Sequence, residues 1–304
     1  MENFDEILKY FGFTPSSKVE HLRQHHNSTW TIDNEYILKQ NSDKDQGQAE
    51  KAIAVSKFLR GEGIPVAEYL TANTGSGFVA SDGCVYTVMR KLNGKHIEAF
   101  SGDFIERARN TGVEVARLHK ALKNFSGIDV HDSYLIDELK NWVSPAIESA
   151  NITIPNAIMG ECLNFAEEYS SLPRQIIHRD IQYGNILFED NRLSGFLDFD
   201  SLQKNVRIFD VVYFLQAVLV DNYHDNRFIK LWREFADSFL LGYHSESKLC
   251  ASEVSAFYRM ALSIQLIFIA WFASKEPNFI AKSVKMAEWV YSNKDVFDFN
   301  VKGT

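Results

Sequence analysis

The chain has 304 residues, of which 45% are hydrophobic and 24% charged, a composition typical of a folded protein rather than a disordered one. Its 40 acidic residues outnumber its 32 lysines and arginines, and the formal net charge of -8 argues against nucleic-acid binding, which requires a cationic surface. The chain has three widely spaced cysteines and no CxxC pair: Cys84, Cys162 and Cys250. This pattern argues against a disulfide framework or a zinc site and favours the cytoplasm.

The first 92 residues predict a small β-rich lobe. The extreme N-terminus is acidic and lacks the basic start and apolar run of a secretory signal. Short runs rich in β-branched and aromatic residues, separated by turn residues, predict strands at 18–23, 29–32, 35–40, 66–71 and 85–89. Between the third and fourth of these strands, helical spacing of apolar residues predicts one helix at 49–60.

From residue 93 to 304 the pattern becomes mainly helical. Apolar residues at helical spacing predict helices at 104–122, 136–150, 158–169, 254–272 and 280–292, with Pro145 expected to kink or split the second. One β segment, 176–199, interrupts them. The most apolar stretch, Met260–Ala273, is shorter than the roughly 20 residues that a membrane span needs, so we expect a buried helix and no membrane association.

The strongest sign of chemistry lies in residues 176–200. Asp180 and Asn185 occupy a loop between apolar strand residues, and a turn then leads into a second strand that ends at Asp198. Because the turn folds the second strand beside the first, Asn185 and Asp198 are expected at the same end of a hairpin. Such oxygen ligands suit Mg²⁺, and an aspartate such as Asp180 can accept the proton of an attacking hydroxyl. Asp200 could bind a second Mg²⁺ or line the cleft, and the sequence leaves both open.

A second signal lies upstream. Lys39 falls in a strand-like run, and Glu50 stands in the helix that follows. A strand lysine that reaches nucleotide phosphates and is held by a helix glutamate is an arrangement used in phosphoryl transfer. The position of this pair upstream of the motif in residues 176–200 strengthens the interpretation.

Together these motifs resemble the aminoglycoside phosphotransferase and choline kinase superfamily, relatives of the protein kinases, and bacterial phosphotransferases within it. The resemblance covers nearly the whole chain and is carried by Glu50 and these segments: 36–39, 58–59, 63–66, 88–89, 92–94, 116–119, 178–187, 198–200 and 209–210. It implies an α+β, two-lobed protein-kinase-like fold, with a nucleotide-binding lobe at 1–92 and a helical catalytic lobe at 93–304. It also implies ATP and Mg²⁺ as cofactors and transfer of the γ-phosphoryl group to a hydroxyl.

The resemblance assigns roles to the residues of both motifs. Asp180 is implied to be the catalytic base, and Asn185 and Asp198 are implied to bind Mg²⁺. Lys39 is implied to contact the ATP phosphates, with Glu50 as its ion-pair partner.

Other implied contacts concern adenine and the phosphate-binding turn. The adenine contacts fall on the main chain around three residues: Met89, Arg90 and Leu92. The expected phosphate-binding turn, 24–28, contains no glycine, which is a departure from the pattern, and leaves Asn27 and Ser28 as its candidate phosphate contacts. Asp210 is implied to support the catalytic loop.

The acceptor is a small molecule on this interpretation, because only eleven residues separate Asp198 from Asp210 and a protein-kinase activation segment does not fit. The alternatives are an aminoglycoside-like antibiotic, a choline- or ethanolamine-type amino alcohol, homoserine, or a thio-sugar. The acidic balance leans slightly towards a cationic acceptor. A catalytically silent kinase-fold module that binds nucleotide is the rival from another class, and a monomer and a homodimer are both open.

Overall fold

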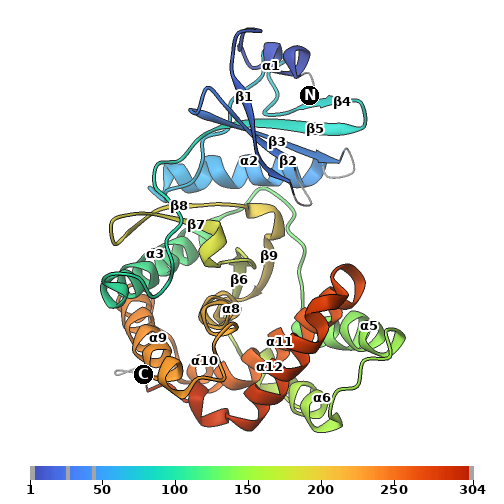
Figure 1. Cartoon of the computed structure of the whole chain (residues 1–304), viewed down its shortest axis with the longest axis vertical. Helices are drawn as coiled ribbons and strands as arrows, with labels where there is room; N and C mark the ends of the chain where they lie inside the picture. The colour runs from blue at the N-terminus through green and yellow to red at the C-terminus, as the bar shows by residue number, and fades with distance from the viewer. Residues whose placement is uncertain (1–3, 25–27, 43–45, 301–304) are drawn as a thin grey trace. The chain divides into compact units, whose positions relative to one another are not determined.

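An antiparallel five-stranded sheet organises the N-terminal part of the chain (Figure 1). The computed structural model describes residues 4–24, 28–42 and 46–300. The strands follow the order β1-β2-β3-β5-β4, with the bounds β1 (Val19–Gln24), β2 (Ser28–Ile32), β3 (Tyr36–Ser42), β4 (Val79–Ser81) and β5 (Cys84–Arg90). β3 is therefore central, and Lys39 lies in its middle, opposite Thr29 on β2 and Thr87 on β5.

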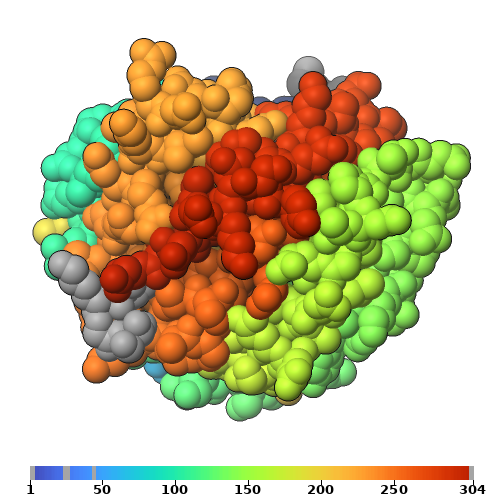
Figure 2. Space-filling view, turned by 90° about the horizontal axis from the view of Figure 1, so that it is seen from below, coloured from blue at the N-terminus to red at the C-terminus, as the bar shows by residue number. Residues whose placement is uncertain are grey.

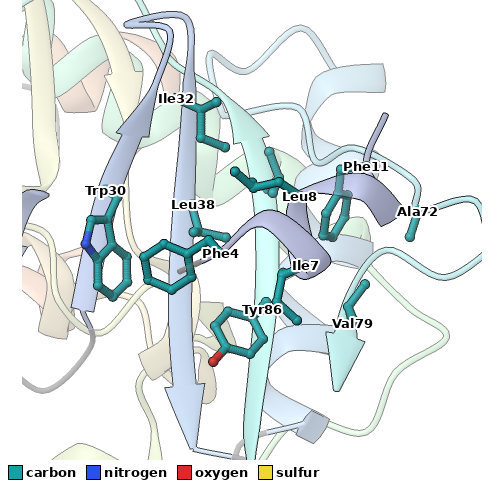
Figure 3. Close-up of a cluster of buried hydrophobic side chains, with 11 residues drawn as sticks. Phe4, Ile7, Leu8, Phe11, Trp30, Ile32, Leu38, Ala72, Val79 and Tyr86 are labelled. Carbon is teal, nitrogen blue, oxygen red and sulfur yellow. The ribbon is translucent and has the colours of Figure 1, made fainter. Parts of the chain in front are cut away.

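A short N-terminal helix, α1 (Asp5–Tyr10), covers apolar residues of this sheet (Figure 3). Phe4 packs edge-on against Trp30, with ring centroids 4.5 Å apart, and Leu8 belongs to the same buried cluster. Ile7 and Phe11 join the cluster from α1 and the residue after it, and its other buried members come from the strands and the loops beside them: Ile32, Leu38, Ala72, Val79, Tyr86 and Val88. The sequence analysis did not predict α1, because six residues are too few to show a helical period.

The predicted helix of this region is α2 (Gln46–Gly61), whose buried face carries Ala49, Ala52, Val55, Ser56 and Leu59. The predicted strand at 66–71 is wrong. Val66 makes a single bridge to Phe196 and Tyr69 a single bridge to Met89, so the segment pairs with two different strands instead of forming one ladder.

The hairpin of β7 (Ile186–Glu189) and β8 (Arg192–Phe196) packs with this N-terminal sheet region. Phe188 and Lys95 exchange two main-chain hydrogen bonds of 3.0 Å each, and Phe196 N–H donates to Pro65 O at 2.8 Å. Gly94 has φ +106°, and a Cβ there would overlap the Ser194 hydroxyl, so this close approach requires glycine. One compact unit accordingly comprises the chain up to His96 together with 125–128 and 185–200.

The second compact unit comprises 97–124, 129–184 and 201 onward, and it is mainly helical. The two units alternate along the chain, whereas the sequence analysis places a single boundary after residue 92. A two-stranded sheet within this unit pairs β6 (Arg174–Ile177) with β9 (Gln203–Val206). Its helices are α3 (Phe104–Asn124), α4 (Leu135–Glu138), α5 (Ser144–Ser149), α6 (Asn156–Leu163), α7 (Ala166–Ser170), α8 (Ile208–Leu219), α9 (Asn226–Glu246), α10 (Ala251–Ser255), α11 (Phe257–Lys275) and α12 (Ile280–Ser292).

Two glycines set the crossing of the long helices α3 and α9, which lie side by side in Figure 1. A Cβ on Gly112 would overlap the carbonyl oxygen of Phe239, and a Cβ on Gly242 would overlap that of Arg109. The two backbones are therefore in direct contact. On another face of this unit, α12 and the segment after it (red) run between α9 (orange) and the green-yellow helices α5 and α6, as Figure 2 shows.

Two predictions about this unit are refined by the structure. The predicted helix 136–150 is split into α4, a π-helical turn η2 (Leu139–Val143) and α5, with Pro145 in the first turn of α5. α11 is longer than its apolar stretch suggested: among the described residues it is the one helix long and apolar enough to cross a bilayer, and 61% of that window is buried inside the protein. Such burial is typical of a core helix, as predicted for Met260–Ala273.

Candidate active site

Lys39 forms the centre of the candidate site in the sheet-containing unit. Its Nζ lies 2.6 Å from Asp200 Oδ2 and 3.2 Å from Asp198 Oδ1. The side chains of Lys39 and Asp200 are only 14% and 19% exposed, whereas that of Asp198 is 42% exposed. The hairpin brings Asn185 to the same place, because Leu197 N–H donates to Asn185 O at 2.9 Å just beyond the paired ends of β7 and β8.

The charge of Lys39 is fixed by these neighbours. Burial alone would lower the pKa of Lys39, but the carboxylates of Asp200 and Asp198 outweigh it and raise that pKa above its usual value. The lysine is therefore a permanent ammonium group at physiological pH, as a contact for anionic phosphates must be.

Asn185 and Asp198 offer an amide oxygen and a carboxylate, a donor set that suits a hard cation. Within the described ranges, no three His, Cys, Asp or Glu side chains gather into a metal-binding group. A divalent cation at this place would therefore need further oxygen ligands, from phosphates and water. That requirement fits Mg²⁺, which keeps several waters and binds through few protein carboxylates.

Glu50 is not brought to Lys39. Its exposed carboxylate accepts a hydrogen bond from Gln46 Nε2 at 3.1 Å, while the described ion pairs of Lys39 are those with Asp198 and Asp200. The Glu50–Lys39 pair implied by the family resemblance is thus absent among the described residues. The cause is the orientation of α2, which turns Ala49 and Ala52 inward and leaves Glu50 on its solvent side.

The proposed adenine segment begins at the end of β5. Met89 is half-buried beside Ile37, and Arg90 N–H donates to Glu68 O at 2.8 Å. Lys91 N–H donates to Glu35 O at 2.8 Å, and the half-buried Leu92 lies directly after it.

Of the two candidate phosphate contacts in the preceding turn, the structure describes one. Ser28 opens β2, half-buried and opposite Gln40, and Thr29 next to it faces Lys39. Asn27 lies outside the described residues.

Asp180 belongs to the helical unit, where two side chains orient it. Tyr213 Oη donates to Asp180 Oδ1 at 2.7 Å, and Gln182 Nε2 donates to the same oxygen at 3.1 Å. Burial and the nearby Asp180 charge raise the pKa of Tyr213 well above its usual value, so the hydroxyl stays protonated and keeps donating. Sequence reasoning missed Tyr213, because it lies in α8, 33 positions after Asp180.

The main chain just before Asp180 is held by Asp210, at the start of α8. Asp210 Oδ2 accepts from His178 N–H at 2.9 Å, and Oδ1 accepts from Arg179 N–H at 2.8 Å. His119 Nε2 lies 3.1 Å from Asp210 Oδ2, and its Nδ1 lies 2.7 Å from Tyr243 Oη. His119 is thus a buried histidine with both ring nitrogens partnered.

A pocket of about 230 Å³ lies beside this loop, wholly within the helical unit. Gln182 lines this pocket and also donates a hydrogen bond to Asp180, so a single side chain connects the pocket wall with the carboxylate. Its other lining residues include carboxylates and aromatic rings: Glu98, Phe100, Tyr183, Asp221 and Phe228.

These features are the ones expected of a phosphotransferase with a hydroxyl acceptor, and the comparisons with known proteins show that class. The chain belongs to the phosphotransferase enzyme family, whose model matches residues 19–251. A homoserine kinase of Zymomonas mobilis subsp. mobilis is 24% identical over 229 residues, covering 72% of this chain and 68% of the relative. A homoserine kinase of Bartonella henselae is 24% identical over 306 residues, covering 97% and 90%.

Solved structures confirm the predicted fold. An amicoumacin kinase in complex with AMP-PNP, Ca²⁺ and Ami has a TM-score of 0.72 at 18% identity, covering 96% of this chain and 94% of that chain. A microcompartment-associated aminopropanol kinase has a TM-score of 0.71 at 16% identity, covering 96% and 97%. The two-lobed, kinase-like α+β fold and the superfamily expected from the motifs are therefore both confirmed.

Proposed function

We propose that this protein is an ATP- and Mg²⁺-dependent kinase that transfers the γ-phosphoryl group to a hydroxyl of a small molecule. The observation that carries the proposal is the grouping of Lys39 with Asp198, beside Asn185, in one compact unit. A cation-binding pair of oxygen donors next to a permanent ammonium group is what a nucleotide triphosphate with its metal ion requires.

Lys39 would contact the ATP phosphates, and Asn185 and Asp198 would hold Mg²⁺, which neutralises phosphate charge when bound. Ser28, at the start of β2, and Asn27 remain the proposed phosphate contacts. For adenine, the main-chain N–H groups of Arg90 and Lys91 already have partners, so the proposal narrows to the main chain of Leu92 and to carbonyl groups nearby, with Met89 packing beside them. This nucleotide chemistry, together with three free cysteines, favours the cytoplasm.

Asp180 would accept the proton of the acceptor hydroxyl as its oxygen attacks the γ-phosphorus and the bond to the leaving ADP oxygen breaks. Tyr213 and Gln182 both hold Oδ1, so they fix the direction of the carboxylate before the acceptor arrives. Asp180 precedes Asn185 by five positions in the sequence, and the proposal assigns both to one reaction.

The acceptor would be a compact amino alcohol or homoserine-like molecule. The pocket beside Gln182 measures about 230 Å³, below the roughly 300–1,000 Å³ of pockets for drug-sized ligands. Glu98 on its lining favours an ammonium group, whereas the carboxylate of Asp221 already pairs with Lys282 at 2.5 Å. Phe100 and Phe228 supply apolar walls. The homoserine kinase relatives support the same size class, and a whole aminoglycoside is disfavoured.

An ATP-consumption screen over homoserine, amino alcohols, aminoglycosides and sugars, with phosphorus NMR of the product, tests the proposal. We expect a phosphomonoester from a small amino alcohol or homoserine, and Asp180→Asn should lower kcat by about 10²–10⁴-fold while ATP still binds. Preferred turnover of an aminoglycoside would overturn the acceptor class. Unchanged turnover in Asp180→Asn would overturn the mechanism, and absence of turnover with every acceptor would favour a silent nucleotide-binding module.

A further inference from the structure

Arg179, the residue before the proposed base, is held on two sides within the helical unit. Its Nη2 lies 2.6 Å from Glu138 Oε2, and the two side chains are only 13% and 18% exposed. Its Cζ lies 3.8 Å from the ring centroid of Phe209. An arginine this enclosed is a fixed structural element, not a surface charge.

The main chain of Arg179 is also unusual. Its φ of +73° is in the left-handed region, which residues with a side chain rarely adopt, so surrounding contacts must impose it. Asp210 supplies one such contact through Arg179 N–H, and Glu138 supplies another through the guanidinium. Asp180 comes next in the chain, so its position depends on this backbone turn.

Glu138 is itself well anchored. Its second carboxylate oxygen, Oε1, accepts a hydrogen bond from Ser133 Oγ. It ends α4 directly before the π-helical turn η2, a rare irregularity that often occurs at functional sites. The carboxylate therefore presents a rigid anionic partner to Arg179.

We infer that Glu138 is a positioning residue for phosphoryl transfer, acting on Asp180 through Arg179. Kinases that depend on activation-loop phosphorylation order their loops through new pairs between arginine and a phosphorylated residue. This chain has only eleven residues between Asp198 and Asp210, and a built-in carboxylate takes the place of the added phosphate. The inference rests on the proposed role of Asp180 as the base.

The test compares Glu138→Gln with a matched control in the same unit. Glu253 makes a two-point, buried pair with Arg207, with both contacts at 2.7 Å, and neither side chain has a described hydrogen bond to residues 178–180. Both substitutions remove the charge of one buried partner, so both should lower thermal stability. Only Glu138→Gln should lower kcat, by about tenfold or more, with the KM for ATP changed by less than about twofold, because a displaced base affects the chemical step.

A double-mutant cycle separates positioning from general loosening. If Glu138 acts through Arg179, then Glu138→Gln and Arg179→Gln should be strongly non-additive in kcat, and the double variant should be no slower than Arg179→Gln alone. Additive losses would overturn the inference, as would a kcat of Glu138→Gln within about twofold of the wild type, or an equal loss in Glu253→Gln. A wild-type protein inactive towards every acceptor would instead refute the proposed function.

Discussion

Replacing Asp200 by asparagine tests which carboxylate orients Lys39. Removing one partner of a fully buried ion pair costs about 3–5 kcal/mol. Here Asp198 stays 3.2 Å from the ammonium group and is 42% exposed, so Lys39 keeps one partial partner. We therefore expect Asp200→Asn to destabilise the protein by about 2 kcal/mol, the range for one hydrogen bond to a charged group. A misplaced Lys39 should also bind the ATP phosphates less well. A loss of about 1.4 kcal/mol in that contact would raise the KM for ATP about tenfold.

Glu50→Gln is the matched control, because the same charge is removed from a solvent-exposed carboxylate that contacts Gln46. Exposed substitutions of this kind change stability by about 0.5 kcal/mol or less, so its melting temperature and KM for ATP should stay at wild-type values. Thermal unfolding and steady-state kinetics on both variants provide the readout. If Glu50→Gln raised KM as much as Asp200→Asn, the helix glutamate would be the working partner of Lys39 and our reasoning would be refuted.

Three further outcomes follow from other contacts. Tyr213→Phe removes a donor to Asp180 and should lower kcat about tenfold with KM unchanged; steady-state kinetics showing an unchanged kcat would contradict this. Gly242→Ala should destabilise the protein by about 2 kcal/mol or more in chemical denaturation, because its Cβ would overlap Arg109 O, whereas Gly160→Ala in α6, with open space, should stabilise it by about 0.5–1 kcal/mol. EDTA should abolish turnover and leave the melting temperature unchanged, and residual turnover in EDTA would argue against metal dependence.

Much of the site could be predicted from sequence because its information is local. Asp180, Asn185 and Asp198 lie on one loop and one hairpin, and the hairpin geometry that brings Asn185 near Asp198 follows from turn residues between two short strands. The strands around Lys39 were predicted less completely. The segment 66–71 has strand-like composition but bridges two different strands, and the short strand β4 was not predicted. Composition reports the preference of a segment and says nothing of how many partners it meets.

The contacts that hold the site could not be predicted, because they come from distant helices. Tyr213 and Glu138 are 33 and 41 positions from the residues they contact, and the residue patterns of their helices, α8 and α4, do not indicate those contacts. The Glu50–Lys39 pair was predicted from the order of the lysine strand and the helix that follows it. Sequence order does not give the rotation of α2 about its axis, and that rotation leaves Glu50 on the solvent side. Sequence spacing gives the order of elements, and helix rotation is set by packing.

The short segment after Asp198 is occupied by regular structure, which leaves no room for a mobile activation segment. Residues 199–201 form one 3₁₀ turn, and β9 then pairs with β6, the strand that leads into the loop, from Gln203 opposite Ile177 to Val206 opposite Arg174. Asp210 follows at once and bonds the main chain of His178. Nearly every residue between the two aspartates is therefore committed to a turn or a ladder. With no free segment there to carry a regulatory phosphate, we propose that the resident carboxylate of Glu138 helps to fix Arg179 and, through it, the proposed base.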